Sequence, residues 1–405
     1  GLKVMSSACE VTELRENRQT KNKSDGSKTR NIRGIPKYNS ANFAGTVKSK
    51  DCTLILCEGD SAKAGILSGL AMEDKDIFGV YPLKGKLMNV RGEAFSKIYA
   101  NKEIVEITKI MGLITKHDYK TMEDVNTNLR YSKIMFMTDQ DLDGSHIKGL
   151  CINLFACEWP SLMKIPGFVS YMNTPILKAT KGKQELEFYN DVDYNKWKES
   201  TPNSSSWHVK YYKGLGTSTS AEFKKYFKNR RVIDFSYNDT TSDPIIDMVF
   251  NKKRACDRKT WLQEYDPNEQ ACTTSTSVSY DDFVNHELIH FSKYDCDRSL
   301  PGIMDGLKTS LRKILYSAFK KNLTHEIKVA QFSGYVSEHS GYHHGEMSLN
   351  QAIVGMAQNF VGSNNINLLF PSGQFGTRLR GGKDSASERY IFTRLNDITK
   401  IVYNE

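Results

Sequence analysis

The sequence predicts an α/β protein in which a domain built on a parallel sheet is followed by a second, smaller domain. Three short apolar runs alternate with helical stretches in the first half of the chain. Beyond residue 290 the apolar residues recur at helical spacing and are followed by a Gly- and Arg-rich segment. Alternation of strand and helix is typical of open α/β folds, and the later change of pattern indicates a separate domain.

The three apolar runs have the composition of strands that are buried on both faces. They are Cys52–Cys57, Ile77–Tyr81 and Lys133–Thr138. Continuous apolar strands of this kind are found in parallel sheets that helices cover on both sides. Helices are expected at Ser61–Leu70 and Ile104–Ile114, between the strands, so that polar residues gather at the carboxyl ends of the strands, where such sheets bind ligands.

The second domain is expected to contain two helices and a turn. Ile303–Lys320 has apolar residues at helical spacing with basic residues between them, and Gln351–Phe360 gives a second helix. Gly373–Gly382 suits a tight β-turn or wing. The stretches 201–206 and 268–278 are polar and are expected to be exposed loops.

Composition excludes several classes of protein. The 405 residues are 39% hydrophobic, and no apolar run approaches the roughly 20 residues that a membrane-spanning helix needs. The first residues have no secretory apolar region, so export is not expected. The eight cysteines include no C-x-x-C pair and no zinc spacing, which indicates free thiols in a reducing compartment.

Positive charge is concentrated at the start of the chain. The net charge is +9, and residues 1–50 hold eleven Lys or Arg against four acids. This segment is interpreted either as a solvated linker or as an arm that follows a polyanion, where each neutralised phosphate releases counterions.

Three carboxylates follow the third apolar run at alternate positions. Asp139, Asp141 and Asp143 fall on one side of an extended segment, and three like charges that close cost energy unless a cation lies between them. A solvated acidic turn is the simplest alternative. The spacing also matches the opening of an EF-hand loop, but the twelfth position is Leu150 where that loop needs Glu.

Glu58 directly follows the first apolar run. Alone, a strand-to-helix turn explains the Glu58–Ala62 segment. Neighbouring parallel strands would bring Glu58 beside Asp139 and make a four-carboxylate site for one or two divalent cations near a phosphate. Oxygen ligands favour Mg²⁺, with Mn²⁺ or Ca²⁺ as substitutes.

Other motifs have little meaning alone. Lys84 and Lys86 beside Gly85, and Lys213 in a Gly-rich turn, combine positive charge with a backbone that can approach a phosphate, although plain turns explain both. His343 and His344 lack the spacing of a zinc-protease helix, so His344 is interpreted as a phosphate hydrogen-bond donor or a structural histidine.

Tyr390 follows Arg389 in the segment SERYIF. A tyrosine in such a context is usually a surface or packing residue. Chemically, its hydroxyl could serve as a nucleophile and store a phosphodiester as a phosphotyrosine bond, with the guanidinium stabilising charge on the phosphate oxygens.

The motifs also form an ordered set. EGDSA, PLKGK and DQDLDG are followed by KYYKGLGTSTS, RSLPGIMDGLKTSLRKILY, SGYHHGEMSLNQAIVGMAQNFVGSNNINLL and GQFGTRLRGGKDSASERYIFTRL. The first three resemble a TOPRIM domain, which topoisomerases share with primases and some nucleases. The whole set, from about residue 30 to the end, resembles type IIA DNA topoisomerases of the eukaryotic kind, cellular or from a large DNA virus.

The resemblance implies a domain order and a set of site residues. It implies a basic linker or arm at 1–50, a Rossmann-like TOPRIM domain with a linking segment at 51–240, a linker at 241–289 and a winged-helix DNA-cleavage domain at 290–405. The implied catalytic residues are Tyr390, Arg389, His344 and Arg298, and the implied metal ligands are Glu58, Asp139, Asp141 and Asp143. The expected DNA-binding residues are Lys84, Lys86, Lys213, Lys308, Arg312 and Arg378.

The family makes transient breaks in double-stranded DNA through a 5′-phosphotyrosyl link, and it acts as a homodimer in which one subunit's tyrosine works with the other's carboxylates. We expect the chain to lack the ATPase domain, tower and coiled coil, so that ATP belongs to the full-length enzyme only. We expect the nucleus for a cellular protein, and the host cytoplasm, viral factory or host nucleus for a viral one. Two alternatives remain: a TOPRIM nuclease that uses metal-bound water, and a non-catalytic DNA-binding fragment.

Overall fold

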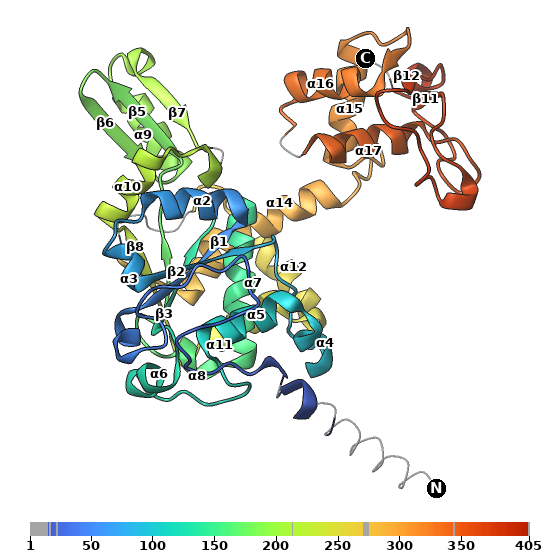
Figure 1. Cartoon of the computed structure of the whole chain (residues 1–405). Coiled ribbons are helices and arrows are strands. Elements are labelled where there is room, and N and C mark those ends of the chain that lie inside the picture. Colours follow the sequence, from blue (N-terminus) through green and yellow to red (C-terminus); the bar gives the residue numbers. More distant parts are fainter. Residues whose placement is uncertain are drawn as a thin grey trace, which may run out of the picture. The chain divides into compact units, whose positions relative to one another are not determined.

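The chain forms two compact units, residues 1–293 and 294–405 (Figure 1). The computed structural model describes residues 15, 18–21, 23–212, 214–269, 275–342 and 345–403. His344 and Lys213, which the sequence predicts to contact DNA, lie outside the described residues. Among the helices within these ranges, none is both long enough and apolar enough to cross a membrane.

The first unit is built around a six-stranded sheet with the order β2-β1-β3-β4-β8-β9. Neighbouring strands are parallel except for β4 and β8. The strands are β1 (Thr53–Glu58), β2 (Phe78–Leu83), β3 (Lys133–Met137), β4 (Val169–Met172), β8 (Val232–Ser236) and β9 (Ser277–Ser279). The three predicted strands are present as β1, β2 and β3, which confirms the predicted parallel α/β sheet.

Helices cover both faces of this sheet. Leu54 and Leu56 of β1 belong to a buried cluster that includes residues of α5 and α7, whereas Ile55 and Cys57 belong to a cluster formed with α2 and α10. Successive residues of β1 therefore enter different cores, which explains why the strand is apolar throughout. The helices are α2 (Gly59–Gly69), α3 (Asp74–Ile77), α4 (Phe95–Ala100), α5 (Lys102–Met111), α6 (Met122–Asn128), α7 (Leu142–Glu158), α8 (Pro160–Met163) and α10 (Ser220–Asn229).

The described part of the predicted basic arm packs onto the first unit. The fully buried guanidinium of Arg130 donates hydrogen bonds to the carbonyls of Thr29 (2.6 Å) and Arg30 (3.2 Å). The short helix η1 (Val47–Asp51) then leads into β1. Residues near 30 therefore provide backbone partners for a buried charge.

A second, antiparallel sheet of the first unit has the order β6-β5-β7. It consists of β5 (Leu177–Lys181), β6 (Gln184–Phe188) and β7 (His208–Tyr211). Trp197 of α9 (Asp191–Ser200) packs against Phe188, with ring centroids 5.2 Å apart. This small sheet leads directly into the Gly-rich segment 214–217 that precedes α10.

Residues 241–289, predicted to be a linker, are folded wherever they are described. Ile246, Phe250 and Leu288 are buried in the same cluster as the inner face of α7. The segment contains α11 (Ser242–Phe250), η4 (Lys252–Arg254), α12 (Ala255–Gln263), α13 (Tyr280–Phe283) and the π-helix η5 (Val284–Leu288). It contributes to the core of the first unit, and its apolar pairs 245–246 and 249–250 were the available sequence signal.

The second unit is a winged-helix domain, as predicted. Three helices pack on a three-stranded antiparallel sheet with the order β10-β12-β11, and a long loop joins β11 to β12. The elements are α15 (Thr309–Lys320), β10 (Ile327–Lys328), α16 (Val329–Ser340), α17 (Glu346–Ala357), β11 (Leu369–Ser372), η6 (Arg378–Arg380), β12 (Phe392–Leu395) and α18 (Thr399–Val402). Helix α14 (Ile289–Ser299) connects the two units along the chain.

The first helix of this unit begins later than the sequence predicts. We expected it to begin at Ile303, but α15 begins at Thr309. Gly306 has a φ of +66°, and the Asp305 carboxylate accepts a hydrogen bond from the Leu307 N–H at 2.9 Å. This turn interrupts the helical path and leaves Ile303 98% exposed.

Candidate functional site

The four predicted metal-ligand carboxylates belong to one edge of the main sheet. Glu58 is the last residue of β1, and Asp139 lies two residues beyond the end of β3 at Met137. The parallel register pairs Cys57 with Met137, so both strands reach this edge together (Figure 1). The Asp139 N–H donates to Oε2 of Glu58 at 3.4 Å. The predicted juxtaposition of Glu58 and Asp139 is therefore present.

Crowding at this edge disfavours ionisation. Burial raises the pKa of Glu58 to about 7, and the charges of Asp139, Asp141 and Asp143 contribute to this rise. Burial also raises the pKa of Asp139 and of Asp141, and the backbone hydrogen bonds that they accept oppose this shift only in part. The edge accordingly holds more negative charge than the fold stabilises by itself.

Backbone N–H groups fix two of the aspartates. Asp139 Oδ1 accepts from the Leu215 N–H at 2.7 Å. Asp141 is the N-cap of α7, where its Oδ1 accepts from the Gly144 N–H at 2.7 Å. A carboxylate has two oxygens with about four lone pairs, so these contacts set the orientation of each group and leave capacity for a further partner.

Helix α7 also excludes the EF-hand alternative. A calcium loop requires twelve irregular residues from Asp139, but the chain becomes helical at Leu142. Leu150, at the twelfth position, is buried in the middle of α7. The Asp run is therefore a strand-to-helix connection, as in the four-carboxylate interpretation.

The lysines predicted to bind DNA differ in their surroundings. Lys86 Nζ lies 2.8 Å from Asp143 Oδ1 and 4.7 Å from the centroid of the Phe291 ring. Lys84 is exposed, and its backbone N–H donates to Glu103. Lys86 thus partly neutralises the acidic edge, whereas the Lys84 side chain is available to solvent.

The donor chemistry of the edge fits a hard divalent cation. All four side chains offer carboxylate oxygens, and the raised pKa of Glu58 shows that added positive charge would be stabilising there. Within the described ranges, no three His, Cys, Asp or Glu side chains stand close enough together to hold a metal ion as they are now oriented. Binding would therefore require side-chain rotations on a backbone that already brings the residues to one edge.

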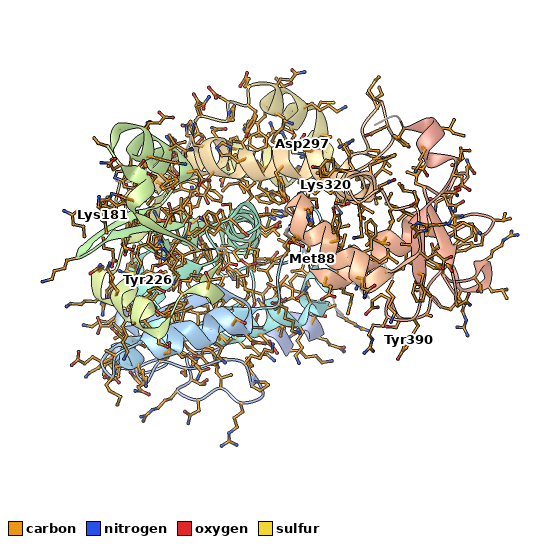
Figure 2. All side chains as sticks on the ribbon, turned by 90° about the horizontal axis from the view of Figure 1, so that it is seen from above. Met88, Lys181, Tyr226, Asp297, Lys320 and Tyr390 are labelled. Carbon is orange, nitrogen blue, oxygen red and sulfur yellow. The ribbon has the colours of Figure 1, made fainter. Side chains whose placement is uncertain are left out.

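Tyr390 lies at the surface of the second unit (Figure 2). Its side chain is 72% exposed, and the guanidinium carbon of Arg389 lies 5.8 Å from the centroid of its ring. The backbone around it is tied to α16, because Ala330 N–H donates to Glu388 (3.2 Å) and Val329 N–H to the buried Ile391 (3.0 Å). A fixed backbone thus presents an exposed phenol.

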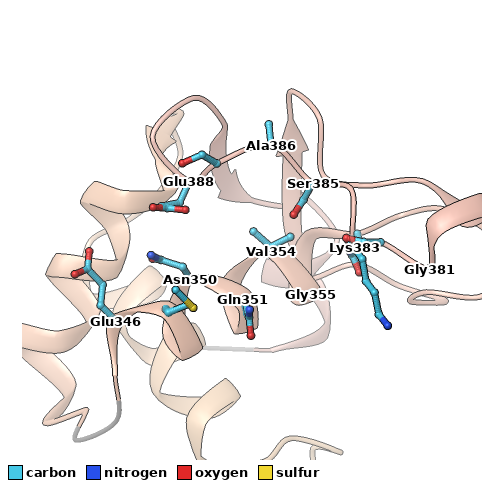
Figure 3. A pocket seen from close by; sticks show the side chains of 14 residues that line it. Glu346, Asn350, Gln351, Val354, Gly355, Gly381, Lys383, Ser385, Ala386 and Glu388 are labelled. Atoms are coloured by element: carbon cyan, nitrogen blue, oxygen red, sulfur yellow. Dashed lines mark hydrogen bonds between the residues drawn. The ribbon is translucent and has the colours of Figure 1, made fainter. Parts of the chain in front are cut away.

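A pocket of about 810 Å³ adjoins the Tyr390 segment. It lies between α17 and residues 381–388, and Glu388 is part of its wall (Figure 3). Most side chains that line it are polar, including Glu346, Gln351 and Lys383. Asn350 also lines it, and its buried Oδ1 has no hydrogen-bond partner among the described residues. The surroundings of the tyrosine segment are therefore polar and hollowed.

The remaining predicted residues of the second unit are not equivalent. Arg298, at the end of α14, pairs with Asp295 at 3.0 Å and lies 4.7 Å from the Tyr294 ring. Arg312 makes two hydrogen bonds to the Asp305 carboxylate, at 2.6 and 2.8 Å. Lys308 and Arg378 are exposed. Arg312 thus has a structural partner, whereas the exposed pair resembles a phosphate-binding surface.

Sequence reasoning missed the groups that hold the acidic edge together. The segment Lys213–Thr217 was interpreted as a phosphate-binding turn, but its Leu215 amide binds Asp139. A Cβ on Gly214 would lie 2.3 Å from Asp139 Oδ2, so the absence of a side chain is what permits this approach. The N-cap role of Asp141 could have been found from its position directly before a helical pattern.

Comparison with known protein families assigns nearly the whole chain. The Toprim domain matches residues 53–167, the C-terminal associated domain of TOPRIM matches residues 172–296, and the DNA gyrase/topoisomerase IV family, through its A-type chain, matches residues 298–405. These boundaries place the folded segment 241–289 with the TOPRIM-associated region and the winged-helix unit with the gyrase-type region.

Curated relatives agree with these families. The chain is 53% identical to DNA topoisomerase 2 of Plasmodium falciparum over 391 residues, which cover 95% of this chain and 28% of that protein. It is 48% identical to human DNA topoisomerase 2-alpha over 417 residues, covering 100% and 27%, and 50% identical to DNA topoisomerase 2 of Drosophila melanogaster over 396 residues, covering 94% and 27%. The chain thus spans just over a quarter of the length of these relatives.

A solved structure gives the same assignment. The crystal structure of the Plasmodium falciparum topoisomerase II DNA-binding, cleavage and re-ligation domain matches with a TM-score of 0.80 and 52% identity, over 93% of this chain and 51% of that one. Sequence, domain order and fold agree: the chain belongs to the type IIA DNA topoisomerase family, in its eukaryotic DNA topoisomerase II branch.

Proposed function

We propose that this chain is the DNA-binding and DNA-cleaving part of a DNA topoisomerase II, an enzyme that passes one duplex through a transient double-strand break in another. The observation that carries the proposal is the conjunction of an acidic, cation-requiring sheet edge in one unit with a rigidly presented Arg389–Tyr390 pair in the other. ATP hydrolysis would belong to the full-length enzyme.

In the proposed reaction, the Tyr390 hydroxyl oxygen attacks a backbone phosphorus. The new Tyr390 O–P bond forms as the P–O3′ bond breaks, so the phosphate stays on Tyr390 through a 5′ link. The phenol loses its proton, and the departing 3′ oxygen gains one. The 3′ hydroxyl reverses the same step and reseals the strand, which conserves the energy of the phosphodiester.

The chain's own residues supply charge and orientation for this step. Arg389, adjacent to the nucleophile, would donate hydrogen bonds to the non-bridging phosphate oxygens, and Arg298 and His344 would assist. The residues that would hold a divalent cation are Glu58, Asp139, Asp141 and Asp143. The bound cation, for which we propose Mg²⁺, would supply Lewis-acid stabilisation of charge on the phosphate and the leaving oxygen.

DNA binding is proposed to involve exposed basic residues of both units. Lys84, Lys308 and Arg378 are exposed and can neutralise phosphates, which makes binding salt-dependent. Lys86, Lys213 and Arg312 are included by their place in the family motifs. For Arg312, DNA contact would compete with its Asp305 partner.

The family also suggests an arrangement in the cell. We propose a homodimer in which one subunit's Tyr390 acts with the acidic edge of the other, so that two sites cut two strands. The proposed location is the nucleus for a cellular protein, or a host compartment that contains the viral DNA for a viral one.

A cleavage assay tests the proposed reaction. The protein is incubated with supercoiled plasmid and Mg²⁺, the reaction is stopped with detergent, and protein attached to 5′ ends is measured. We expect a covalent adduct in the wild type and none in Tyr390→Phe, whose DNA binding should remain. Cutting without any adduct would instead support the metal-dependent nuclease, and binding without cutting would support a non-catalytic DNA-binding protein.

A further inference from the structure

One carboxylate closes the base of the loop that contacts Asp139. Glu222 Oε1 accepts a hydrogen bond from the Tyr212 hydroxyl at 2.5 Å, just before the loop, and Oε2 accepts from the Thr219 N–H at 2.8 Å, just after it. Thr219 in return caps α10 by accepting from the Glu222 N–H. A single side chain therefore joins the two ends of segment 212–219.

Two lysines keep this carboxylate ionised and in place. Lys210 Nζ lies 2.8 Å from Glu222 Oε2, and Lys178 Nζ lies 3.1 Å from Oε1. The Glu222 side chain is only 12% exposed. Burial opposes its charge, but the hydrogen bonds from Lys210 and Tyr212 outweigh this and lower the pKa of Glu222. Ionised partners make such hydrogen bonds stronger than neutral ones.

The loop transmits this order to the acidic edge. The Leu215 side chain is buried in the cluster shared by α2 and α10, and the short helix η3 (Leu215–Thr217) is closed by hydrogen bonds such as Thr217 N–H to Gly214 at 3.0 Å. The Leu215 N–H then points at Asp139 Oδ1 from 2.7 Å. Because Gly214 comes within contact of the same carboxylate, a small shift of the loop would move Asp139.

We propose that Glu222 is a positioning residue of the divalent-cation site, which acts by closing segment 212–219 so that the Leu215 amide holds Asp139 in its ligand orientation. This inference rests on the metal site proposed above. It assigns to Glu222 no contact with substrate or cation. Partners that orient a metal ligand commonly change metal affinity by one to two orders of magnitude.

Two measurements on the 405-residue chain test the proposal, with Glu222→Gln as the variant and Glu185→Gln as the matched control. Glu185 belongs to the same charge network, where it pairs with Lys225 and Lys178, but it has no contact with segment 212–219 among its described partners. In Glu222→Gln we expect the Leu215 amide to exchange hydrogen about tenfold faster. We also expect Mn²⁺, used alone as the probe, to bind about tenfold more weakly.

Tyr212→Phe provides a milder second variant, since it removes only the hydroxyl contact to Oε1 and preserves the ring. It should shift both readouts in the same direction, by less. If Glu222→Gln and Tyr212→Phe exchange the Leu215 amide and bind Mn²⁺ like Glu185→Gln, the proposal is wrong. If instead wild-type Mn²⁺ binding is insensitive to Glu58→Gln, the metal site itself fails, and the Leu215 exchange rate still decides whether Glu222 closes the loop.

Discussion

The acidic edge of the first unit and the Tyr390 segment of the second differ in how much of their chemistry their own surroundings reveal. At the edge, burial and neighbouring charge raise the pKa of Glu58, and backbone amides orient Asp139 and Asp141. Tyr390, in contrast, is 72% exposed and has Arg389 as its neighbour.

This difference shows that a metal site and a nucleophile leave different traces in a fold. Crowded carboxylates are costly, so their presence at one sheet edge requires a compensating cation. An exposed tyrosine costs nothing, so its role becomes visible only through the family to which the chain belongs. The predictions below separate the two regions, beginning with the largest effect.

Removing one charge from the acidic edge should have the largest effect on cleavage. Asp141→Asn keeps an oxygen that can cap α7 but loses a ligand charge, so we expect Mg²⁺-dependent cleavage to fall by roughly 100-fold or more, with DNA binding retained. Cleavage is measured as covalent adduct at saturating DNA. Unchanged cleavage would show that Asp141 is not a metal ligand.

Mixing two inactive variants tests whether the two regions act across a dimer. Asp141→Asn retains the tyrosine and Tyr390→Phe retains the carboxylates, so a mixed dimer contains one complete site if the site is shared between subunits. We expect the mixture to nick one strand, whereas neither variant alone cleaves. A mixture as inactive as its components would place tyrosine and carboxylates in the same subunit.

The pH dependence of stability should reveal the cost of the acidic edge. Because burial and charge raise the pKa of Glu58 from 4.5 to about 7, the folded state retains a proton that the unfolded chain releases between these values. Without metal, stability therefore falls as pH rises through this window and stays low above it.

Glu58→Gln should remove this loss and stabilise the metal-free chain at pH 8 by on the order of 2 kcal/mol. Mg²⁺ should then stabilise the wild type more than the variant. Urea unfolding in chelator at pH 5.5 and pH 8 measures both effects. A wild type and a variant with the same pH dependence would contradict the assignment of Glu58 to a crowded site.

The smallest effect is expected in the loop of the second unit. Arg378→Ala should weaken DNA binding evenly across sequences and reduce the salt slope by about 1, with the melting temperature unchanged, because the residue is exposed. Arg312→Ala should lower the melting temperature, since it breaks the bidentate pair with Asp305. Equal effects of both substitutions on stability would show that the structural distinction between these arginines is wrong.

Much of the fold could be predicted because its physical signals are local. The runs that became β1 and β3 are apolar at successive residues, which only strands covered on both faces require. The start of α15 could not be predicted from periodicity, because Gly306 and the Asp305 turn interrupt a pattern that otherwise continues to Ile303.

The candidate site was predictable to a lesser extent. The alternate spacing of the aspartates indicated a cation site, and the sheet brings Glu58 beside Asp139 as expected. The Leu215 contact to Asp139 joins residues 76 positions apart, and the pairing of Arg312 with Asp305 depends on a turn that the sequence did not indicate. Such contacts arise from tertiary packing and have no local signature.

The most direct test of the central claim is to identify the residue that carries DNA after cleavage. The trapped complex is digested with nuclease and protease, and the peptides are analysed by mass spectrometry. The proposed mechanism predicts a nucleotide joined through its 5′ phosphate to the hydroxyl of Tyr390, formed only with a divalent cation and an intact acidic edge. A nucleotide on any other residue, or cleaved DNA with no modified peptide, would contradict it.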